Sequence, residues 1–581
     1  MRHYAISAAI VSLAWVAGTA VPCTNHAALG QGATSTAPAQ SAYDAGDLPL
    51  PQGWEAGEIR WWYHVSQGTA LMPYDWFIAL EQPPLPLEQP QPGEQLFKDP
   101  AYLARLGFLT DPGPQNPDGL PVGFSRRKPI DSPDQPPYTC WKGDWVGFGC
   151  AACHTGQVNY QNHQIRIEGG PAQHDLEAFG GLLGAALAMT LASAPRFKHF
   201  ADRVLPSGSR TERDQLRENL GCFIESLAKT QLLFDSAQLS ALERPTPPGF
   251  GRLDAVHRGG NFLLAATLGE PRNYKPTTAP VSFPTLWDTP YFDWVLYNAS
   301  VARPLERNVI EALATFAPID PRTILTDHVD HGVDMDTIVS IHHALEKLRS
   351  PQWPEDKLGP IVAAKRDRGE KVYGQHCEGC HYRIDRESHA VIAGKPTAAS
   401  ATQLRIPMIP VDEVGTDAQH AYNFAKRMMS LEKVKGPPQI AYYKAAGDLS
   451  NHIVEQWAKQ SSDHHQEEQH IDGDRPVDFR PNLGYRARPL NGIWATAPYL
   501  HNGSVPTLYE LLLPPQERRR IFYMGNWEFD PVRVGLLASN PFPGSSTFDT
   551  RLPGNSNAGH DYGTDLSEDQ RMDLLEFLKS L

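Results

Sequence analysis

Two copies of one five-residue pattern, Cys-x-x-Cys-His, constrain this chain more than any other feature of its sequence. The pattern reads CAACH at residues 150–154 and CEGCH at residues 377–381. In each pentad the two thiols lie one helical turn apart, so both can add to the vinyl groups of one porphyrin while the histidine points its imidazole at the iron. The sequence therefore predicts two covalently attached c-type haems. The predicted attachment residues are Cys150, Cys153, Cys377 and Cys380, and the predicted iron ligands are His154 and His381.

A redox dithiol and a zinc ribbon are the two alternatives for paired Cys-x-x-Cys sequences. A thioredoxin-like dithiol does not need a histidine after the second cysteine in two separate copies. A zinc ribbon places its cysteine pairs about 15–20 residues apart, whereas these pairs lie in different halves of the chain. Both alternatives therefore fit the pentads less well than haem attachment does.

The composition limits the class of protein. The 581 residues carry a formal net charge of −14, which disfavours a nucleic-acid binder, and a mean hydropathy of −0.41 disfavours a polytopic membrane protein. Hydrophobic residues make up 41% of the chain, enough for a sizeable core, and 52 prolines predict long irregular connections. We expect a mainly α fold with long irregular loops and little β, in which two cytochrome c-like haem modules form one compact chain.

The chain divides into four predicted parts. Residues 1–22 have a short positive start, an apolar stretch and small residues at a cleavage position, as in a signal peptide, and residues 23–50 have the composition of a disordered lead-in. The break SPQWP at 350–354 separates an N-terminal haem domain, 51–350, from a C-terminal cytochrome c domain, 351–581. The mature protein is then expected to be periplasmic or secreted from a bacterium, without an integral membrane segment.

Apolar residues at helical spacing predict a set of helices. The predicted segments are 172–191, 212–232, 300–316, 336–349, 361–373 and 567–581. In the last segment Ser567 and Gln570 form the pattern of a capping box, which marks the start of a helix.

Three other features leave alternatives open. Residues 78–140 are rich in Pro, Gly and Asp and predict a loop-rich wrap. The His-rich stretch SSDHHQEEQH at 461–470 could bind a metal, but without paired spacing in a structured frame it is more typical of a solvated loop. Cys140 and Cys222 either form a disulfide in an oxidising compartment or stay unpaired.

The function of each haem depends on the sixth ligand of its iron. A second histidine or a methionine gives an electron-transfer haem, whereas an open face permits O₂ or peroxide to bind. For the second haem we favour His560 over Met524, and we interpret His501 as a structural residue in a turn. His174 and His257 could close the first haem, but both are more typical of ordinary polar residues.

Three segments resemble the diheme cytochrome c peroxidase superfamily. They are RARPLNGIWATAPYLHNGSVPTLYELL at 486–512, FDPVRVG at 529–535 and NAGHDYGTDLS at 557–567. Within that superfamily the chain is most similar to the rubber oxygenase branch, the secreted dihaem dioxygenases that cleave polyisoprene. The surroundings of the first pentad, residues 146–172, are similar to that branch as well.

The resemblance implies a division of labour between the two haems. The C-terminal haem would be closed by His381 and His560, and the N-terminal haem, held by His154, would be the open and reactive one. A bis-imidazole haem has a low potential and no free position, which suits it to hold or relay an electron. Some relatives also hold a calcium ion between domains.

An aromatic segment, residues 279–308, supplies the candidate catalytic residues Trp287, Phe283 and Phe292. Core packing is the ordinary role for such side chains. In the superfamily a tryptophan lies between the two haems, and Trp287 matches it by context. The oxygenase branch often has a phenylalanine over the reactive haem, but Ala302 stands where the motif would place it, which puts the substrate class in doubt.

Together with the resemblance, these features predict an oxygenase that uses O₂ to cleave the C=C bonds of a hydrophobic polymer such as polyisoprene. One alternative is a dihaem peroxidase that reduces H₂O₂ with electrons from a donor cytochrome or cupredoxin. A peroxidase needs a distal carboxylate or amide for proton transfer, for which Glu168 is a candidate. A second alternative is a dihaem electron carrier in which both irons are closed.

Overall fold

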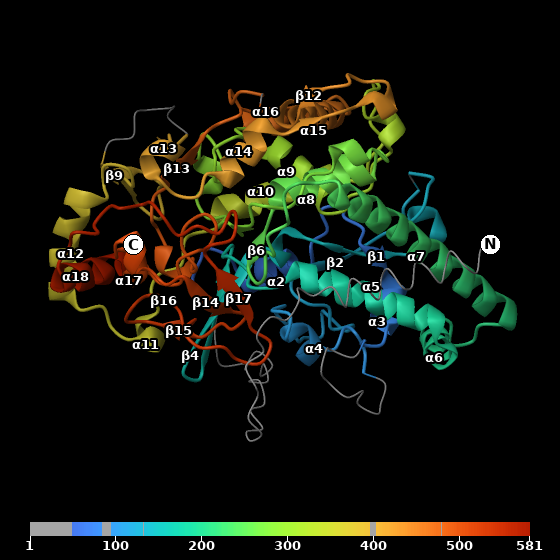
Figure 1. Cartoon of the computed structure of the whole chain (residues 1–581), viewed down its shortest axis with the longest axis horizontal. Coiled ribbons are helices and arrows are strands. Elements are labelled where there is room, and N and C mark those ends of the chain that lie inside the picture. The colour runs from blue at the N-terminus through green and yellow to red at the C-terminus, as the bar shows by residue number, and fades with distance from the viewer. Residues whose placement is uncertain (1–48, 84–94, 132, 395–402, 478) are drawn as a thin grey trace.

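The computed structural model of the protein describes residues 49–83, 95–131, 133–394, 403–477 and 479–581 (Figure 1). Helices make up 42% and strands 13%, in small sheets, so the prediction of a mainly α fold is confirmed at this level. The predicted signal peptide and most of the predicted lead-in lie outside the described residues. Leu50, the last residue of that lead-in, is buried in a hydrophobic cluster and is therefore ordered, contrary to the prediction.

Most of the elements are short and are joined by loops (Figure 1). The helices are α2 (Ala56–His64), α3 (Tyr74–Ala79), α4 (Pro100–Ala104), α5 (Leu176–Ala192), α6 (Ala194–Val204), α7 (Arg210–Leu239), α8 (Ala255–Gly260), α9 (Pro304–Ala314), α10 (Met335–Lys347), α11 (Glu355–Leu358), α12 (Ala363–His376), α13 (Val411–Val414), α14 (Gln419–Lys426), α15 (Tyr442–Ala458), α16 (Ser462–Asp472), α17 (Leu508–Leu511) and α18 (Glu568–Ser580). The strands are β1 (Met72–Pro73), β2 (Phe124–Arg127), β3 (Trp145–Phe148), β4 (Thr155–Tyr160), β5 (His163–Glu168), β6 (Arg252–Leu253), β7 (Val281–Ser282), β8 (Arg383–Ile384), β9 (Val391–Ala393), β10 (Met408–Pro410), β11 (Met428–Met429), β12 (Ile440–Ala441), β13 (Gly484–Arg486), β14 (Ile521–Met524), β15 (Phe529–Asp530), β16 (Gly535–Leu536) and β17 (Ser546–Asp549).

The predicted helices form as α5, α7, α9, α10, α12 and α18. The capping box at the start of α18 is present, because Ser567 Oγ accepts a bond from the Gln570 amide and the Gln570 side chain accepts one from the Ser567 amide. Among the described residues no single helix is long and apolar enough to cross a membrane. Only α5 and α6 taken together, with a bend of 102° between them, reach that length and composition.

The prediction of a solvated loop at 461–470 is wrong, because α16 covers these residues. Ser461 Oγ caps the helix by accepting a bond from the His464 amide at 3.1 Å, and the His464 ring stacks on Trp457 at 4.5 Å. Ile471 and Asp472 at the other end are buried. The serine cap at the start and the buried residues at the end stabilise α16, although its polar composition has no apolar periodicity that would predict a helix.

Strands surround the first pentad, whereas a helix leads into the second. The three-stranded antiparallel sheet has the order β1-β3-β2, and β3 runs almost directly into Cys150. After the pentad the chain enters the antiparallel hairpin β4–β5, in which Thr155 pairs with Glu168. The second pentad follows α12 without a break. This difference agrees with the clear helical pattern before Cys377 and its absence before Cys150.

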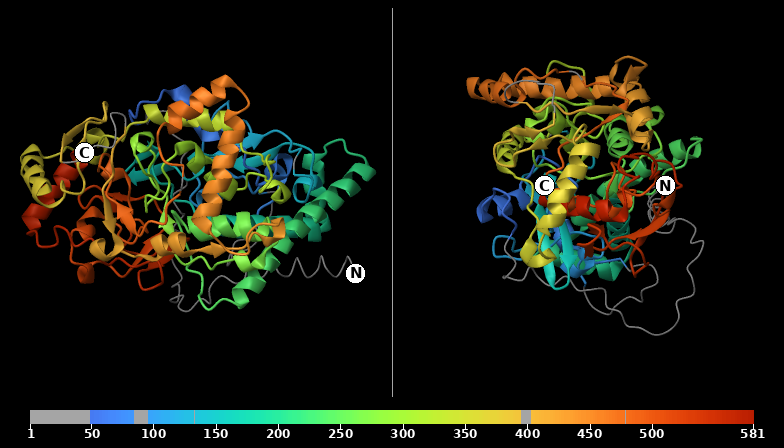
Figure 2. Two further views of the ribbon diagram at one scale, coloured as in Figure 1. Left: turned by 90° about the horizontal axis from the view of Figure 1, so that it is seen from above. Right: turned by 90° about the vertical axis from the view of Figure 1, so that its left-hand side faces the viewer.

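Three large hydrophobic clusters and a small fourth one around Ala421 hold the described elements together. The first joins Trp62 of α2 and Trp287 to Leu574 of α18, and α12 packs along α18 at the end that carries the C-terminus (Figures 1 and 2). The second joins Leu305 of α9 to Ile453 of α15, so it draws on both sides of the break at 350–354. The third lies around Trp76 and includes α5 and α7.

Cys140 and Cys222 form a disulfide, with their Cα atoms 5.8 Å apart. Cys140 ends a short turn before β3, and Cys222 lies in the middle of α7. The bond spans 82 residues of sequence and ties α7 to the sheet that leads into the first pentad. The pairing that the sequence left open is therefore present.

Removal of this bond should destabilise the protein. A cross-link across a loop of 82 residues restricts the unfolded chain, and loss of a native disulfide costs about 2–5 kcal/mol. We expect the double variant Cys140→Ser/Cys222→Ser to unfold at a lower urea concentration than the oxidised protein. The wild type unfolded in the presence of a thiol reductant is the control and should shift by a similar amount. Equal midpoints for the variant and the oxidised wild type would contradict a stabilising bond.

Glu168, at the end of β5, is a buried carboxyl group. Its Oε1 accepts a hydrogen bond from the Tyr63 hydroxyl at 2.6 Å, and its amide donates to Gln52 Oε1 at 2.9 Å. Burial raises the pKa of Glu168 to about 7, against the lowering effects of Tyr63 and Arg166. The folded state therefore holds a proton on this group at a pH where the unfolded chain does not.

The raised pKa predicts a pH dependence of stability. An unfolded glutamate has a pKa of about 4.3, so between this value and about 7 the folded state binds more protons. The free energy of unfolding should then fall by up to about 4 kcal/mol as the pH rises through this window. Urea unfolding at pH 5 and pH 8 should show a smaller difference for Glu168→Gln than for the wild type. Glu517→Gln, which removes an exposed carboxyl, should keep the full difference. An unchanged difference in Glu168→Gln would refute the assignment.

Candidate haem-binding site

The first pentad forms a tight turn that ends at His154. The His154 amide donates to the Cys150 carbonyl at 3.0 Å. Gly123 lies against this turn, with a φ of +85° and no room for a side chain, because a Cβ there would be 2.1 Å from Ala152 Cα. His154 Nδ1 donates to the Pro284 carbonyl at 2.7 Å. This bond fixes the tautomer and leaves Nε2 as the ring nitrogen that can bind a metal.

The second pentad repeats this arrangement at the end of α12. The Cys377 amide donates to the Tyr373 carbonyl at 2.8 Å, so the helix leads directly into the turn. His381 Nδ1 donates to the Arg488 carbonyl at 2.7 Å. Both pentad histidines therefore use Nδ1 for a backbone carbonyl and keep Nε2 free for a metal. Burial also lowers the pKa of both imidazoles, that of His154 to about 4, which keeps them in the neutral form that metals bind.

A second imidazole faces His381. The ring centroids of His381 and His560 are 6.4 Å apart, with an angle of 47° between the ring planes. This separation leaves room for one metal ion with a bond of about 2 Å to each ring. His560 has a φ of +50°, and its carbonyl accepts a bond from Arg518. Gly559 before it lies so close to Gly415 that a Cβ would be 2.1 Å from the Gly415 carbonyl carbon. The backbone thus holds His560 in place.

Among the described residues, no second imidazole is paired with His154 in this way. The His174 ring stacks on Phe108, with centroids 4.7 Å apart, and lies 5.1 Å from Phe283. Of the other candidate ligands, Met524 is buried in β14, and His501 stacks on Tyr485 at 4.1 Å. The two pentads are therefore unequal.

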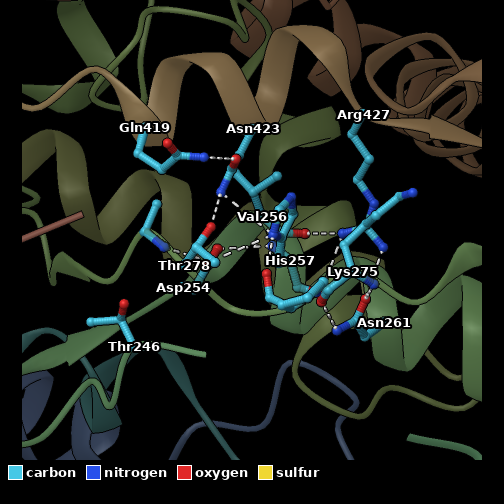
Figure 3. Close-up of polar contacts among 12 residues, drawn as sticks. Thr246, Asp254, Val256, His257, Asn261, Lys275, Thr278, Gln419, Asn423 and Arg427 are labelled. Carbon is cyan, nitrogen blue, oxygen red and sulfur yellow. Dashed lines mark hydrogen bonds and ion pairs between the residues drawn. The ribbon is translucent and has the colours of Figure 1, made fainter. Parts of the chain in front are cut away.

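His257, the other candidate for the first haem, belongs to a buried polar network (Figure 3). Its Nδ1 donates to the Pro276 carbonyl at 2.6 Å, and Asp254 Oδ1 accepts a bond from its amide at 2.9 Å. Asn423 of α14 lies 3.4 Å from the same ring nitrogen, and Arg427 donates to the backbone beside it. These contacts give His257 a structural role that joins α8 to α14.

The pentad thiols lack the lowered pKa of a redox dithiol. None of the four is in a disulfide. Burial raises the pKa of Cys150, Cys153 and Cys377 to about 12. A thioredoxin-like dithiol has a lowered pKa that makes the thiolate available. Protonated, unpaired thiols beside a neutral histidine fit haem attachment better.

Two arginines near the pentads have buried guanidinium N–H groups that donate no hydrogen bond to any residue the structure describes. Among the described residues, Arg486 Nη1 and Arg488 Nη2 have no hydrogen-bond partner. Burial and then the charge of Arg488 lower the pKa of Arg486 to about 9, and Arg307 acts in the same direction. Buried positive charge of this kind needs an anion. The two propionate carboxylates of a haem would supply it, so the residues present fit this group.

A chain of contacts links the two pentad histidines. Pro284, which accepts the bond from His154, is followed by Thr285, and Thr285 Oγ1 accepts a bond from the Arg488 guanidinium. The Arg488 carbonyl in turn accepts the bond from His381. Trp287 lies beside this link, with the Arg488 guanidinium 5.6 Å from its ring and its Nε1 donating to the Asn491 carbonyl at 2.9 Å.

The other two candidate catalytic aromatics lie in different surroundings. Phe283 precedes Pro284 and is buried beside His174, so it is near the first pentad. Phe292 packs in the second hydrophobic cluster, with the Arg486 guanidinium 5.5 Å from its ring. Ala302, where a phenylalanine was expected, is buried just before α9.

Sequence analysis missed four residues that the fold brings to the pentads. These are Pro284, Arg486, Arg488 and Glu311. Glu311 of α9 is partly buried with a raised pKa, and its charge acts on both Cys150 and Cys153. Only the two arginines had a sequence signal, as a pair within the segment RARPL.

Comparison with known proteins supports a cytochrome c-like assignment. The family described as RoxA-like, cytochrome c-like matches residues 484–523, which include Arg486, Arg488 and His501. The uncharacterized protein y4iJ of Sinorhizobium fredii is 36% identical over 568 residues, which cover 92% of this chain and 93% of y4iJ. The uncharacterized protein y4iM of the same organism is 26% identical over 330 residues, 54% of this chain and 65% of y4iM. The chain therefore belongs to the family of y4iJ and carries a RoxA-like, cytochrome c-like segment that supports a haem c-containing oxidoreductase.

Proposed function

We propose that the protein is an exported dihaem oxygenase that uses O₂ to cleave the C=C bonds of a hydrophobic polymer such as polyisoprene. One observation carries this proposal. His381 has a second imidazole facing it at a distance that suits one iron, and among the described residues His154 has none. One haem is then bound on both faces, and the other keeps one face for a reactant.

The proposal assigns one c-type haem to each pentad. Cys150 and Cys153 attach the reactive haem and His154 binds its iron, within the N-terminal domain, 51–350. Cys377 and Cys380 attach the second haem, which His381 and His560 bind in the C-terminal domain, 351–581. Arg486 and Arg488 offer their unpaired guanidinium donors to propionates.

The chain's own residues orient the reaction and keep water out. When bound, haem c supplies the O₂ chemistry that no side chain of the protein has. The Pro284 carbonyl holds the His154 ring in one orientation, and the buried Phe283 supplies apolar surface beside it. A hydrocarbon gains affinity only by burial, at about 0.8 kcal/mol per CH₂ group. Both the C=C and the O=O bond break, and one oxygen atom enters each of two new carbonyl groups, so no external reductant is needed.

We assign the second haem to hold or relay an electron. Two imidazoles lower the potential of an iron and leave no free position. Trp287 lies beside the contact between Thr285 and Arg488. That contact joins the two segments whose carbonyls accept bonds from His154 and His381. This position suits a bridge between the haems.

Reduction of H₂O₂ is the second candidate activity, and Glu311 favours it. Proton transfer to a peroxide needs an acid close to the iron. Glu311 is a partly buried carboxyl of raised pKa whose charge acts on both thiols of the first pentad. Glu168, the candidate from the sequence, is instead bonded to Tyr63. A donor cytochrome or cupredoxin would supply the electrons in this case.

Carbon monoxide titration tests the inequality of the two haems. The reduced protein should bind one CO per chain, because only the iron at His154 has a free position. His560→Ala should bind two, since it removes a ligand from the second iron. Absorption spectra recorded during the titration give the count.

His501→Ala is the matched control, because His501 is also a buried histidine of the C-terminal motifs. This variant should still bind one CO. A wild type that binds no CO would be an electron carrier and would contradict the proposal. A count of one in His560→Ala would refute His560 as the ligand.

Isotope labelling tests the reaction. The mature protein incubated with polyisoprene under ¹⁸O₂, without added reductant, should release products with ¹⁸O in both new carbonyl groups, as measured by mass spectrometry. Absence of labelled carbonyl products would contradict cleavage of this polymer. Consumption of H₂O₂ that starts only after one haem has been reduced would favour the peroxidase, and Glu311→Gln should then slow it.

A further inference from the structure

Two helices place histidine and glutamate side chains together on a surface away from the pentads. α10 carries His343 and Glu346, and α16 carries Glu467 and His470. Each pair has a spacing of three residues, so both of its side chains lie on one face of the helix. The two faces meet, because the rings of His343 and His470 have their centroids 5.9 Å apart.

The ligand atoms of three of these residues converge. One nitrogen of His343, one nitrogen of His470 and one oxygen of Glu346 all lie within 4.8 Å of one another. His343 Nδ1 is 2.9 Å from Glu346 Oε2, and His470 Nε2 is 4.0 Å from Glu346 Oε1. In a tetrahedral zinc site with bonds of 2.0–2.1 Å, neighbouring ligand atoms are about 3.3 Å apart. The two separations, one to each oxygen of Glu346, lie on either side of this value, so rotation of the Glu346 carboxylate and of the two rings would complete the site.

Glu467 contacts the second ring nitrogen of His343. His343 Nε2 is 3.0 Å from Glu467 Oε2, while Nδ1 faces Glu346. A metal-binding histidine commonly donates its other ring N–H to a carboxylate, which fixes the ring and makes the first nitrogen more basic. Both ring nitrogens of His343 thus face a carboxylate, and these two contacts raise the pKa of His343 against the lowering effect of burial, so a metal at Nδ1 would replace the proton there.

We propose that His343, Glu346 and His470 bind a divalent transition metal, of which zinc is the best fit. Two imidazoles and one carboxylate form a ligand set that zinc uses with a water molecule in the fourth position. The carboxylates of Glu346 and Glu467 bring two negative charges, which a divalent cation neutralises. The positive Lys347 nearby is paired with Glu58 at 2.8 Å.

The site has access to solvent and joins two elements. His343 and Glu346 line an open cavity of about 460 Å³, so the fourth position can exchange a water molecule or a small ligand. A metal here would tie α16 to α10, which is next to α9 in the fold. This inference does not depend on the proposed oxygenase activity, because none of its residues belongs to the pentads.

Zinc titration of the haem-loaded, full-length mature protein tests the proposal. Isothermal titration calorimetry should show one Zn²⁺ bound per chain at this site. His343→Ala and His470→Ala should each weaken binding at least tenfold, and Glu467→Gln should weaken it by about 10–100-fold without lowering the stoichiometry. His465→Ala, on the same helix but outside the cluster, is the control and should bind as the wild type does.

Two further measurements distinguish a lost ligand from a lost fold, and this site from the pentad thiols. Circular dichroism shows whether each variant is folded like the wild type. X-ray absorption at the zinc edge should show nitrogen and oxygen ligands at about 2.0–2.2 Å, whereas sulfur ligands at about 2.3 Å would place the metal at unoccupied pentad thiols. Sulfur ligation, no binding by the wild type, or unchanged binding in folded His343→Ala and His470→Ala would each overturn the proposal.

Discussion

The site depends on one interaction that occurs twice. Each pentad histidine donates its Nδ1–H to a backbone carbonyl at 2.7 Å, His154 to Pro284 and His381 to Arg488. These bonds set the tautomer and the orientation of each ring, which a covalent link through two thiols cannot do. Because Arg488 also donates to Thr285, the two supporting segments are bonded to each other. A movement of either segment would therefore reach both imidazoles, which makes the link a physical route for coupling the two sites.

The same region holds positive charge that the protein does not neutralise by itself. A buried guanidinium with an unpaired donor costs free energy. Arg486 and Arg488 both have such donors, and Arg488 helps to lower the pKa of Arg486. Charge repulsion between neighbouring arginines is tolerated where an anion completes the site. The fold is thus prepared for a negatively charged group beside two neutral imidazoles, and a haem that carries its propionates meets both requirements.

Local patterns in the sequence predicted more than tertiary contacts did. The helices α9, α12 and α18 were predictable because apolar periodicity, and in α18 also a capping box, are local signals. α16 was not, since its polar sequence has no apolar periodicity and the stacking of His464 on Trp457 arises only in the fold. The pentads and His381 were evident from spacing alone. The partners of their Nδ1 atoms were not, because a backbone carbonyl has no sequence signature and Pro284 and Arg488 are brought there only by folding.

The inequality of the two pentads is built into the backbone rather than into the pentads themselves. Across from His381, a close approach of two glycines and a bond from Arg518 hold His560 in a left-handed conformation. On the other side, His174 is stacked on Phe108, and His257 is held by Asp254 and the Pro276 carbonyl. To face His154, His257 would have to give up these buried contacts, whereas the ring of His174 is held by its stacking on Phe108. The packing that stabilises the fold therefore also holds these two histidines, and among the described residues the imidazole pair of His381 and His560 has no counterpart around His154.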